Sequence, residues 1–345
     1  MPIILYSLAM LLCFILLARI VDKFFVASLD RISNDLKLSS DAAGATLMAV
    51  GSSAPELFVA LFSVLKPGDH EAIGIGSIVG SALFNLLAIG GMVALVKKTK
   101  LTWQPVLRDI LFYFVAVGLL LWGVFDGDFS MWNAVAFLGL YVVYVWAVIK
   151  WRKIFPYEDM EFTPEEEPAD CNEDGKANFV DKTLCLLFPK AERYYLIFFV
   201  SILLIAGLSW VLVETAIQIS VILNIPEAII ALTVLAVGTS VPDMISSLIV
   251  AKQGRGDMAI SNAIGSNIFD ILVGLGFPFM IAMLIYGGTI EAKGQNLLAS
   301  SVILFASLVA FAVLLIFNRW KINWVTGAIL LGLYIFYVAR EIVLL

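Results

Sequence analysis

Three acidic residues of this 345-residue chain, Glu56, Asp243 and Asp270, lie inside long apolar segments. A carboxylate at the depth of a bilayer is costly, so such residues usually face the protein interior or an aqueous cavity and mark an ion pathway. Each acid has hydroxyl-bearing neighbours three or four residues before it, and residues at that spacing share one helix face. Ser81 precedes Asn85 by the same spacing, so with these three acids the sequence predicts a polar stripe on each of four helices. The residues of these stripes are Ser52, Ser53, Glu56, Ser81, Asn85, Thr239, Ser240, Asp243, Ser266 and Asp270.

The stripes belong to two repeated motifs. The stretch 49–56 reads AVGSSAPE and recurs at 236–243 as AVGTSVPD, while 80–85 reads GSALFN and recurs at 265–270 as GSNIFD. Both pairs are separated by nearly the same length of chain, so whole halves are duplicated rather than one short motif. A proline in each first motif removes a backbone donor and frees a carbonyl one turn earlier. We expect a broken helix there, because loosened backbone is tolerated at membrane depth where it lines a cavity.

These groups offer only oxygen ligands. Freed carbonyls near Ala49 and Ala236, with the hydroxyls and carboxylates, would make an all-oxygen cage. Ca2+ takes six to eight oxygens, and Na+ is a hard cation of similar size. No Cys or His lies nearby to recruit Zn or Cu. The pattern therefore predicts a site for hard monovalent and divalent cations. The alternative is that the Gly and Ser residues only pack helices together, but packing does not require three buried carboxylates.

The composition predicts an all-α integral membrane protein. Apolar residues make up 61% of the chain and charged residues 14%, and the mean hydropathy is +0.97. A soluble globule would carry about 25% charged residues. The apolar runs are near the ~20 residues that cross a bilayer. They predict about ten transmembrane helices, at 2–27, 41–66, 71–96, 106–126, 130–151, 194–219, 226–252, 257–286, 295–317 and 322–344.

Five helices, an odd number, separate equivalent positions of the repeats, so the second half must be inverted in the membrane, as in many transporters. The predicted parts are a first five-helix repeat at 1–152, an acidic linker at 153–193 and an inverted repeat at 194–345. Nearly all of the 22 Lys and Arg residues, Arg108 included, fall in loops on one side. The positive-inside rule then predicts a multi-pass protein of the cell membrane with both termini outside and the linker cytoplasmic.

The linker contains a second candidate site. Its oxygen-bearing residues match positions 1, 3, 5, 9 and 12 of a Ca2+-binding loop. They are Asp170, Asn172, Asp174, Asn178 and Asp181, with Gly175 at position 6. The last position is Asp rather than a bidentate Glu, and prolines precede the loop where a helix would enter. A regulatory Ca2+ site and a plain solvated acidic linker are both open readings.

Other functions lack the residues that they need. Cys13, Cys171 and Cys185 have no Zn or disulfide spacing. His70, the only histidine, is expected on the surface of an outer loop, so a hydrolase would have no base in the membrane. Glu214 is expected at the membrane interface, and the dispersed basic residues do not indicate nucleic-acid binding. We predict that the chain is not an enzyme, has no cofactor and no obligate protein partner, and has inorganic cations and the lipid bilayer as its partners.

The two repeated motifs resemble the alpha-repeats of the calcium/cation antiporter superfamily, most closely those of potassium-dependent sodium/calcium exchangers. The resemblance implies a secondary antiporter that exchanges Na+ for Ca2+ by alternating access, with the first and sixth helices sliding past a core of helices 2, 3, 7 and 8. It implies that the ion ligands are the ten stripe residues and the carbonyls near Ala49 and Ala236. The Gly-Asn-x-x-Glu pattern that is usual in cation/proton antiporters is absent from the sequence.

Two questions stay open in the sequence. Potassium-dependent members have an acid at the position of Asp270, and three ionised carboxylates would be balanced by Ca2+ plus K+, which makes Asp270 a candidate K+ site. Prokaryotic exchangers without a K+ requirement can also have an acid there, and burial disfavours the charged form. The counter-ion is the second question: a Ca2+/H+ antiporter on the same fold is the nearest alternative, and a channel is a third.

Overall fold

The computed structural model describes residues 2–35, 49–68, 70–96, 98–155, 184, 187–188, 193–252, 256–292 and 295–343. The helices of the first half, with π-helical turns marked η, are α1 (Pro2–Ile20), η1 (Val21–Val26), α2 (Ala27–Asp35), α4 (Ala49–Ser52), α5 (Ala54–Leu65), α6 (Glu71–Leu83), η3 (Phe84–Ile89), α7 (Gly90–Val96), α8 (Trp103–Asp126) and α9 (Met131–Ile154). Those of the second half are α11 (Tyr194–Leu223), α12 (Glu227–Ile230), η4 (Ala231–Leu235), α13 (Ala236–Thr239), α14 (Val241–Lys252), α15 (Gly256–Leu272), α16 (Gly276–Tyr286), α17 (Gln295–Phe317) and α18 (Trp324–Val343). The strands are β1 (Thr99–Lys100), β2 (Asp128–Phe129), β3 (Ile290–Glu291) and β4 (Lys321–Ile322).

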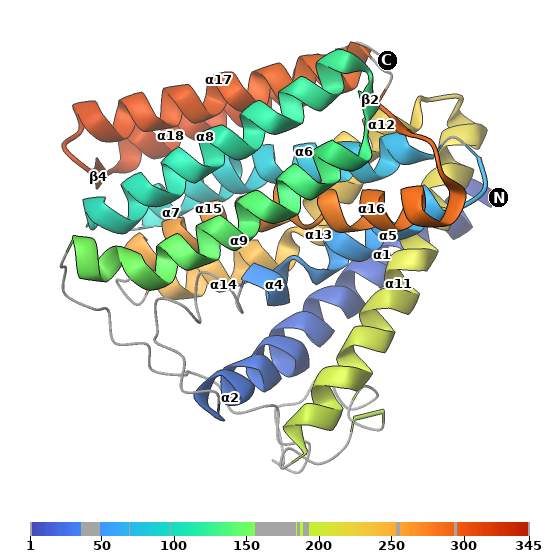
Figure 1. The fold of residues 1–345 in the computed structure, drawn as a ribbon, viewed down its shortest axis with the longest axis horizontal. Coiled ribbons are helices and arrows are strands. Elements are labelled where there is room, and N and C mark those ends of the chain that lie inside the picture. The colour runs from blue at the N-terminus through green and yellow to red at the C-terminus, as the bar shows by residue number, and fades with distance from the viewer. Residues whose placement is uncertain are drawn as a thin grey trace.

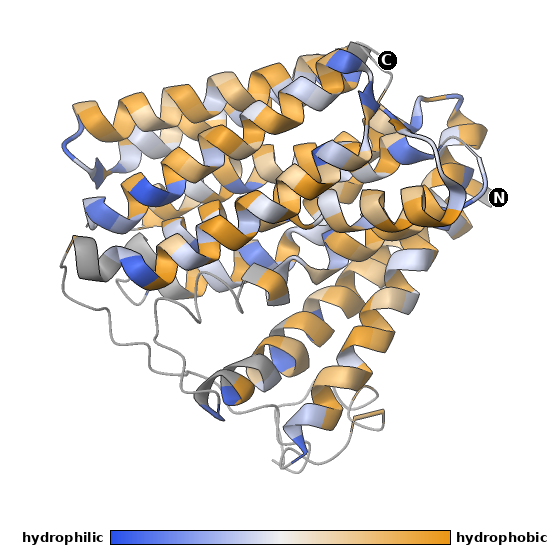
Figure 2. Ribbon diagram, viewed as in Figure 1, coloured by the Kyte–Doolittle hydropathy of each residue, from blue (hydrophilic) through white to orange (hydrophobic). Residues whose placement is uncertain are grey.

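The predicted all-α membrane architecture is confirmed. Within the described ranges, 9 helical stretches are long and apolar enough to cross a bilayer. The remaining predicted helix, at 41–66, is represented by α4 and the shorter apolar helix α5. Large apolar side chains such as Leu203 and Phe336 are exposed on helix surfaces, and hydrophobic residues cover most of the helix lengths in Figure 2. Such an extensive apolar surface is what a lipid environment requires.

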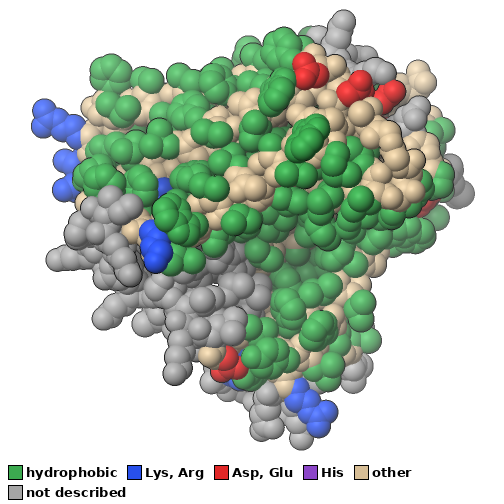
Figure 3. All heavy atoms as spheres, in the orientation of Figure 1, with side chains coloured by type: hydrophobic (Ala, Val, Ile, Leu, Met, Phe, Trp, Pro, Cys, Tyr) green, Lys and Arg blue, Asp and Glu red, His purple; other side chains and the backbone are tan. Residues whose placement is uncertain are grey.

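Charged side chains gather at the ends of the molecule. Exposed Lys100 and Lys321 face each other across the β1–β4 pair, while exposed Asp128 and Glu291 do so across the β2–β3 pair. Figure 3 shows the same division in the upper block of helices, with Lys and Arg at the left edge, where β4 lies in Figure 1, and Asp and Glu toward the upper right, where β2 lies. Charged side chains of both signs also lie at the lower end, near α2 and the lower end of α11. The apolar band therefore lies between a basic end and an acidic end.

The pairing of the short strands demonstrates that the two halves are inverted. In the first half β1 precedes and β2 follows α8, and in the second half β3 precedes and β4 follows α17. The strand before α8 pairs with the strand after α17, and the strand after α8 pairs with the strand before α17. Since α8 and α17 are equivalent helices in contact with each other, this cross-pairing requires them to run in opposite directions.

Helices α1 and α11 form a layer of their own. They pack side by side and lie obliquely below the block of other helices in Figure 1. Buried Leu17 and Leu212 belong to one hydrophobic cluster, which also includes Val59 of α5 and Leu235 of η4. A second cluster fills the space between α6, α8, α15 and α17. Of the segments that carry the repeated motifs, α5 packs on α11, and α13 and α14 contact α1. The other two, α6 and α15, pack against these broken helices from the side away from that layer.

One predicted loop residue is buried instead. Arg108 lies in the second turn of α8 and donates from Nε to Asp109 Oδ1 at 2.8 Å, and the Tyr144 hydroxyl donates to the same oxygen at 3.2 Å. Arg108 and Asp109 are only 2% and 1% exposed. The assignment of Arg108 to an inner loop is therefore wrong, because α8 begins at Trp103 and the guanidinium is compensated inside the protein by a neighbouring carboxylate.

Candidate ion-binding site

Both proline-containing motifs break their helices at the predicted place. The chain leaves α-helical geometry at Ser53, between α4 and α5, with φ −92° and ψ 7°. It does so again at the equivalent Ser240, between α13 and α14, with φ −87° and ψ 4°. This bridge region of backbone conformation is sparsely populated and often found at functional sites. The proline two residues later cannot donate to the preceding turn, so each membrane helix continues as two shorter ones.

The breaks place an acid at the start of each second segment. Glu56 lies in the first turn of α5, and Asp243 lies in the first turn of α14. The positive end of a helix dipole stabilises a negative group at that position. Both carboxylates are buried, and broken helices whose ends meet at the bilayer midplane are typical of ion sites in transporters.

A chain of hydroxyl contacts joins Glu56 to the other half of the protein. Ser240 Oγ donates to Glu56 Oε1 at 3.3 Å and lies 2.7 Å from Ser81 Oγ. The approach of α6 depends on Gly80, because a Cβ at that residue would lie 2.4 Å from the Leu232 carbonyl oxygen in η4. The missing side chain therefore lets Ser81 reach the broken helix of the second half.

A second set of contacts surrounds Asp243. Asn85, in the π-helical turn η3, donates from Nδ2 to Asp243 Oδ2 at 3.1 Å. Ser52 Oγ lies 3.3 Å from Ser266 Oγ, and the Ser52 hydroxyl is also close to the Asp243 carboxylate. Every one of these contacts crosses between the two halves, so the four motifs share one buried site.

Asp270 completes the acidic group. It is fully buried in α15, and the charges of Glu56 and Asp243 both act on it. The hydroxyls of Ser53 and Ser81 lie near its carboxylate. Within the described ranges no three acidic, His or Cys residues are close enough to hold a metal ion by themselves. A cation bound here would therefore also take hydroxyl, amide or carbonyl oxygens.

Several oxygens of the site are buried without a hydrogen-bond donor in the part of the chain that the structure describes. They are Ser53 Oγ, Glu56 Oε2, Asn85 Oδ1, Asp243 Oδ1, and Asp270 Oδ1 and Oδ2. A buried acceptor without a partner costs free energy. A hard cation would satisfy several such oxygens at once, since Ca2+ prefers six to eight oxygen ligands. The donor set therefore fits a hard cation as the bound substrate.

The remaining predicted ligands are near the breaks. Thr239 Oγ1 donates to the Leu235 carbonyl at 3.0 Å, and its hydroxyl also lies beside Glu56. The Ala236 carbonyl accepts a long hydrogen bond from the Ser240 N–H at 3.3 Å, so it is not freed as expected, although a carbonyl has a second lone pair. Ala49 begins α4, and its role as a ligand stays a prediction.

Two residues that the sequence reasoning omitted belong to the same network. Asn267 Oδ1 accepts from Asn85 Nδ2 at 3.1 Å, and Asn267 Nδ2 donates to the Tyr113 hydroxyl at 2.9 Å. Both side chains are fully buried. Two signals in the sequence could have found Asn267: it lies three residues before Asp270, and it departs from the repeat, because the equivalent residue in the first half is Ala82. Tyr113, in α8, lies outside both motifs.

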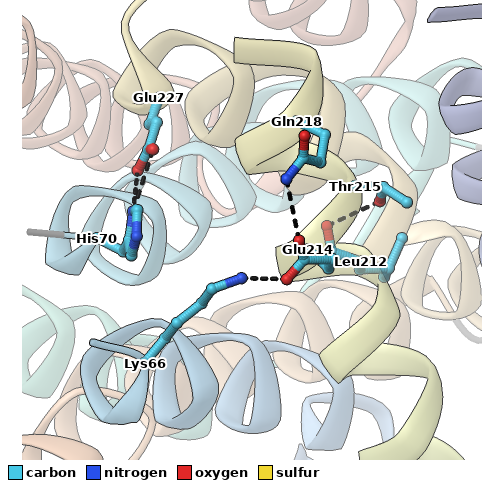
Figure 4. A network of polar contacts seen from close by, with 7 residues as sticks. All are labelled: Lys66, His70, Leu212, Glu214, Thr215, Gln218 and Glu227. Atoms are coloured by element: carbon cyan, nitrogen blue, oxygen red, sulfur yellow. Dashed lines mark hydrogen bonds and ion pairs between the residues drawn. The ribbon is translucent and has the colours of Figure 1, made fainter. Parts of the chain in front are cut away.

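A second polar network lies where α5, α6, α11 and α12 approach one another (Figure 4). Lys66 forms an ion pair with Glu214 of α11, and Gln218 donates to the same carboxylate at 3.1 Å. His70 Nδ1 lies 3.0 Å from Glu227 Oε2 of α12. His70, which was expected on the surface, is therefore only partly exposed and contacts Glu227, and Glu214 of α11 is paired with the lysine that follows α5.

The candidate Ca2+ loop at 170–181 lies outside the described residues, as does most of the linker at 153–193. The regulatory site and the boundaries of the three predicted parts therefore stay predictions.

Comparison with known proteins places this geometry among ion exchangers. A family model described as "Sodium/calcium exchanger protein" matches residues 6–150 and 193–343. Human sodium/potassium/calcium exchanger 4 is 27% identical over 508 aligned positions, which cover 99% of this chain and 81% of that protein. The solved sodium-calcium exchanger NCX_Mj is 25% identical with a TM-score of 0.62, covering 98% of this chain and 99% of that one. The H+/Ca2+ exchanger CAX has a TM-score of 0.67 at 18% identity, covering 99% of this chain and 85% of that one, and shares the fold.

Proposed function

This chain belongs to the sodium/calcium exchanger protein family, and on that premise we propose that it is a secondary antiporter in which Ca2+ and Na+ compete for the site around Glu56, Asp243 and Asp270. The observation that carries the proposal is the meeting of three buried carboxylates with oxygens that lack donors within the described ranges. Both ions need such oxygens, so occupancy by one excludes the other. Exchange follows if the shared site opens to one side of the membrane at a time.

The ligands proposed for this site are the ten residues of the four motifs, with the carbonyls of Ala49 and Ala236. Support comes from the hydrogen bonds that link Ser52 to Ser266, Ser81 to Ser240 and Asn85 to Asp243. The oblique layer of α1 and α11, which packs on the site-bearing helices through apolar side chains, supports a movement of that layer relative to those helices. Such a movement would expose the site alternately to the two sides.

Potassium is proposed as a third transported ion. The name of the similar human sodium/potassium/calcium exchanger 4 includes potassium. In this chain Asp270 supplies the third carboxylate of the site. Ca2+ neutralises two ionised carboxylates, so a monovalent cation at Asp270 would leave the loaded site without net charge, which lowers the cost of holding it inside the membrane. Ca2+ flux that requires K+ in the wild type but not in Asp270→Asn would support this assignment. Flux independent of K+ in both would refute it.

The proposed orientation has both termini outside and the linker in the cytoplasm. The two ends of the chain lie toward the β2 end in Figure 1, away from β4. Exposed Lys98, Lys100, Arg319 and Lys321 belong to the opposite, β1–β4 end, which the positive-inside rule places in the cytoplasm. Labelling of a single cysteine introduced at Asp128 by a membrane-impermeant reagent on intact cells tests this orientation.

The deciding experiment is gradient-driven flux in sealed vesicles that contain the purified protein. We expect an imposed Na+ gradient to drive uptake of radioactive calcium against its own gradient. Uptake driven by a pH gradient and indifferent to Na+ would instead identify a Ca2+/H+ antiporter. Calcium loss from electrically shunted vesicles without any counter-cation would identify a channel. The variant Glu56→Gln serves as the transport-deficient control.

A further inference from the structure

The amide of Asn85 has two chemically different ends, and only one of them can bind a cation. Its oxygen is a cation ligand, whereas its NH2 group would repel a cation. Asp270, at the equivalent place in the second half, has two equivalent oxygens and needs no such orientation. A site that uses Asn85 as a ligand therefore requires something that holds the amide the correct way round.

Asn267 meets this requirement. Its Nδ2 donates to the Ala82 backbone carbonyl at 3.0 Å and to the Tyr113 hydroxyl at 2.9 Å. A backbone carbonyl can only accept, so the Asn267 amide has one possible orientation, with Oδ1 directed at Asn85. That oxygen accepts from Asn85 Nδ2 at 3.1 Å, and Asp243 Oδ2 accepts from the same nitrogen at 3.1 Å.

The consequence for Asn85 is specific. With both hydrogens of Nδ2 used by Asn267 and Asp243, its Oδ1 is turned away from them. This oxygen is buried and accepts no hydrogen bond from the described part of the chain. Asn267 itself is not left with a comparable group, because its NH2 donates twice and its oxygen accepts from Asn85. It is therefore placed to orient a ligand rather than to be one.

We propose that Asn267, held by the Ala82 carbonyl and Tyr113, is the positioning residue that fixes the amide of Asn85 with its oxygen toward the transported cation. The inference rests on the proposed function, since it concerns a ligand of the same site. The departure from the repeat supports it: the second half has Asn267 where the first has Ala82, and Ala82 contributes the carbonyl that anchors it.

The test is a double-mutant cycle between positions 267 and 85. Asn267→Ala should raise the Ca2+ concentration for half-maximal uptake by roughly five- to tenfold, the effect of one lost hydrogen bond, with little change in maximal rate. In an Asn85→Asp background, whose carboxylate needs no orientation, Asn267→Ala should cause no further loss. Asn85→Ala provides a second background with the same expectation.

Two further variants keep the test decisive if Asn267→Ala folds poorly. Tyr113→Phe removes one of the two anchors and should raise the half-maximal Ca2+ concentration by about two- to threefold, again only while Asn85 is present. Asn262→Ala, on the same helix but outside this network, should leave Ca2+ affinity unchanged. Calorimetric titration of the purified full chain with Ca2+ measures the effect of each variant on Ca2+ affinity without transport.

An equal loss from Asn267→Ala in all three backgrounds would overturn the inference, because it would show that Asn267 acts independently of Asn85, as a ligand or as a packing residue. An unchanged affinity in the Asn85 background would overturn it as well. If the wild type neither binds nor transports Ca2+, the proposed function fails instead.

Discussion

Replacement of Glu56 by Gln is the most informative perturbation of the site. The side chain keeps its shape, and its amide oxygen can still accept from Ser240 Oγ, which lies 3.3 Å from Oε1 in the wild type. The change removes one negative charge from a fully buried position. It therefore separates the electrostatic role of the carboxylate from its packing.

The expected effect is larger for Ca2+ than for Na+. At an effective dielectric constant of about 20 and a ligand distance of about 2.4 Å, one carboxylate attracts a divalent cation by roughly 14 kcal/mol and a monovalent cation by roughly 7 kcal/mol, before dehydration is subtracted. Removal of one partner of a buried charge pair leaves a net loss of about 3–5 kcal/mol. We therefore expect Ca2+ affinity to fall at least about a hundredfold, and Na+ affinity to fall by a smaller factor.

Thermal unfolding of the purified protein with and without Ca2+ measures the loss of Ca2+ affinity. At a concentration a hundredfold above its dissociation constant, Ca2+ stabilises the folded state by about 2.7 kcal/mol. After a hundredfold loss of affinity the same concentration contributes only about 0.4 kcal/mol. Without Ca2+ the variant should be at least as stable as the wild type, because the Glu56 Oε2 atom is buried and lacks a donor within the described ranges.

The matched control is Glu341→Gln in α18. Glu341 is also fully buried, but it accepts from Ser300 Oγ at 3.2 Å and pairs with Arg340 at 2.5 Å. Its substitution should lower stability with and without Ca2+ by the same amount. The reasoning is refuted if Glu56→Gln behaves like this control, with a lower melting temperature in the absence of Ca2+ and an unchanged Ca2+-induced shift.

Three further predictions concern contacts that do not involve the three carboxylates of the ion site. Gly80→Val should prevent Ca2+ uptake and lower the melting temperature, because its Cβ would lie 2.4 Å from the Leu232 carbonyl oxygen; normal uptake would contradict the close packing of α6 on η4. Asp109→Asn should destabilise the protein by about 3–5 kcal/mol, measured by denaturant unfolding, because Arg108 would lose a buried partner; a loss below about 1 kcal/mol would contradict a buried pair. Lys66→Glu and Glu214→Lys should each slightly destabilise the protein, and the double exchange should recover about 0.5 kcal/mol in melting experiments, since the pair is partly exposed; additive losses would show that the pair is not formed.

The helix breaks were predictable from sequence because their cause is local. Proline removes a donor wherever it occurs in a helix, so Pro55 and Pro242 were sufficient to predict a broken helix in each motif, and the structure places the breaks at Ser53 and Ser240. The inverted arrangement of the two halves could also be predicted, because it depends only on the number of apolar segments between the repeated motifs. The association of the four stripes followed from the cost of a carboxylate in hydrocarbon.

The errors concern groups whose environment is set by distant segments. Arg108 was assigned to a loop although its partner Asp109 is adjacent, because the sequence does not show that Tyr144 of the distant α9 donates to Asp109 and that the pair is buried. The contact of His70 with Glu227 was not predicted, because Glu227 is remote in sequence. Asn267 lies three residues before Asp270, at the spacing that puts Ser53 on the stripe of Glu56, but it was overlooked because its equivalent in the first half is Ala82. Its partners, Ala82 and Tyr113, come from other helices.

The differences between the two halves are as informative as their likeness. The motifs agree where the backbone must break, but they differ at Asn85 and Asp270 and again at Ala82 and Asn267. An acid at both 85 and 270 would bring the buried carboxylates to four, which Ca2+ alone would neutralise only by half, at a high cost inside the membrane. Asparagine at 85 keeps an oxygen ligand without that charge, but an amide must be oriented. The same loss of symmetry places Asn267 opposite Ala82, where it can orient the amide, so the two departures from the repeat form one adaptation of the site.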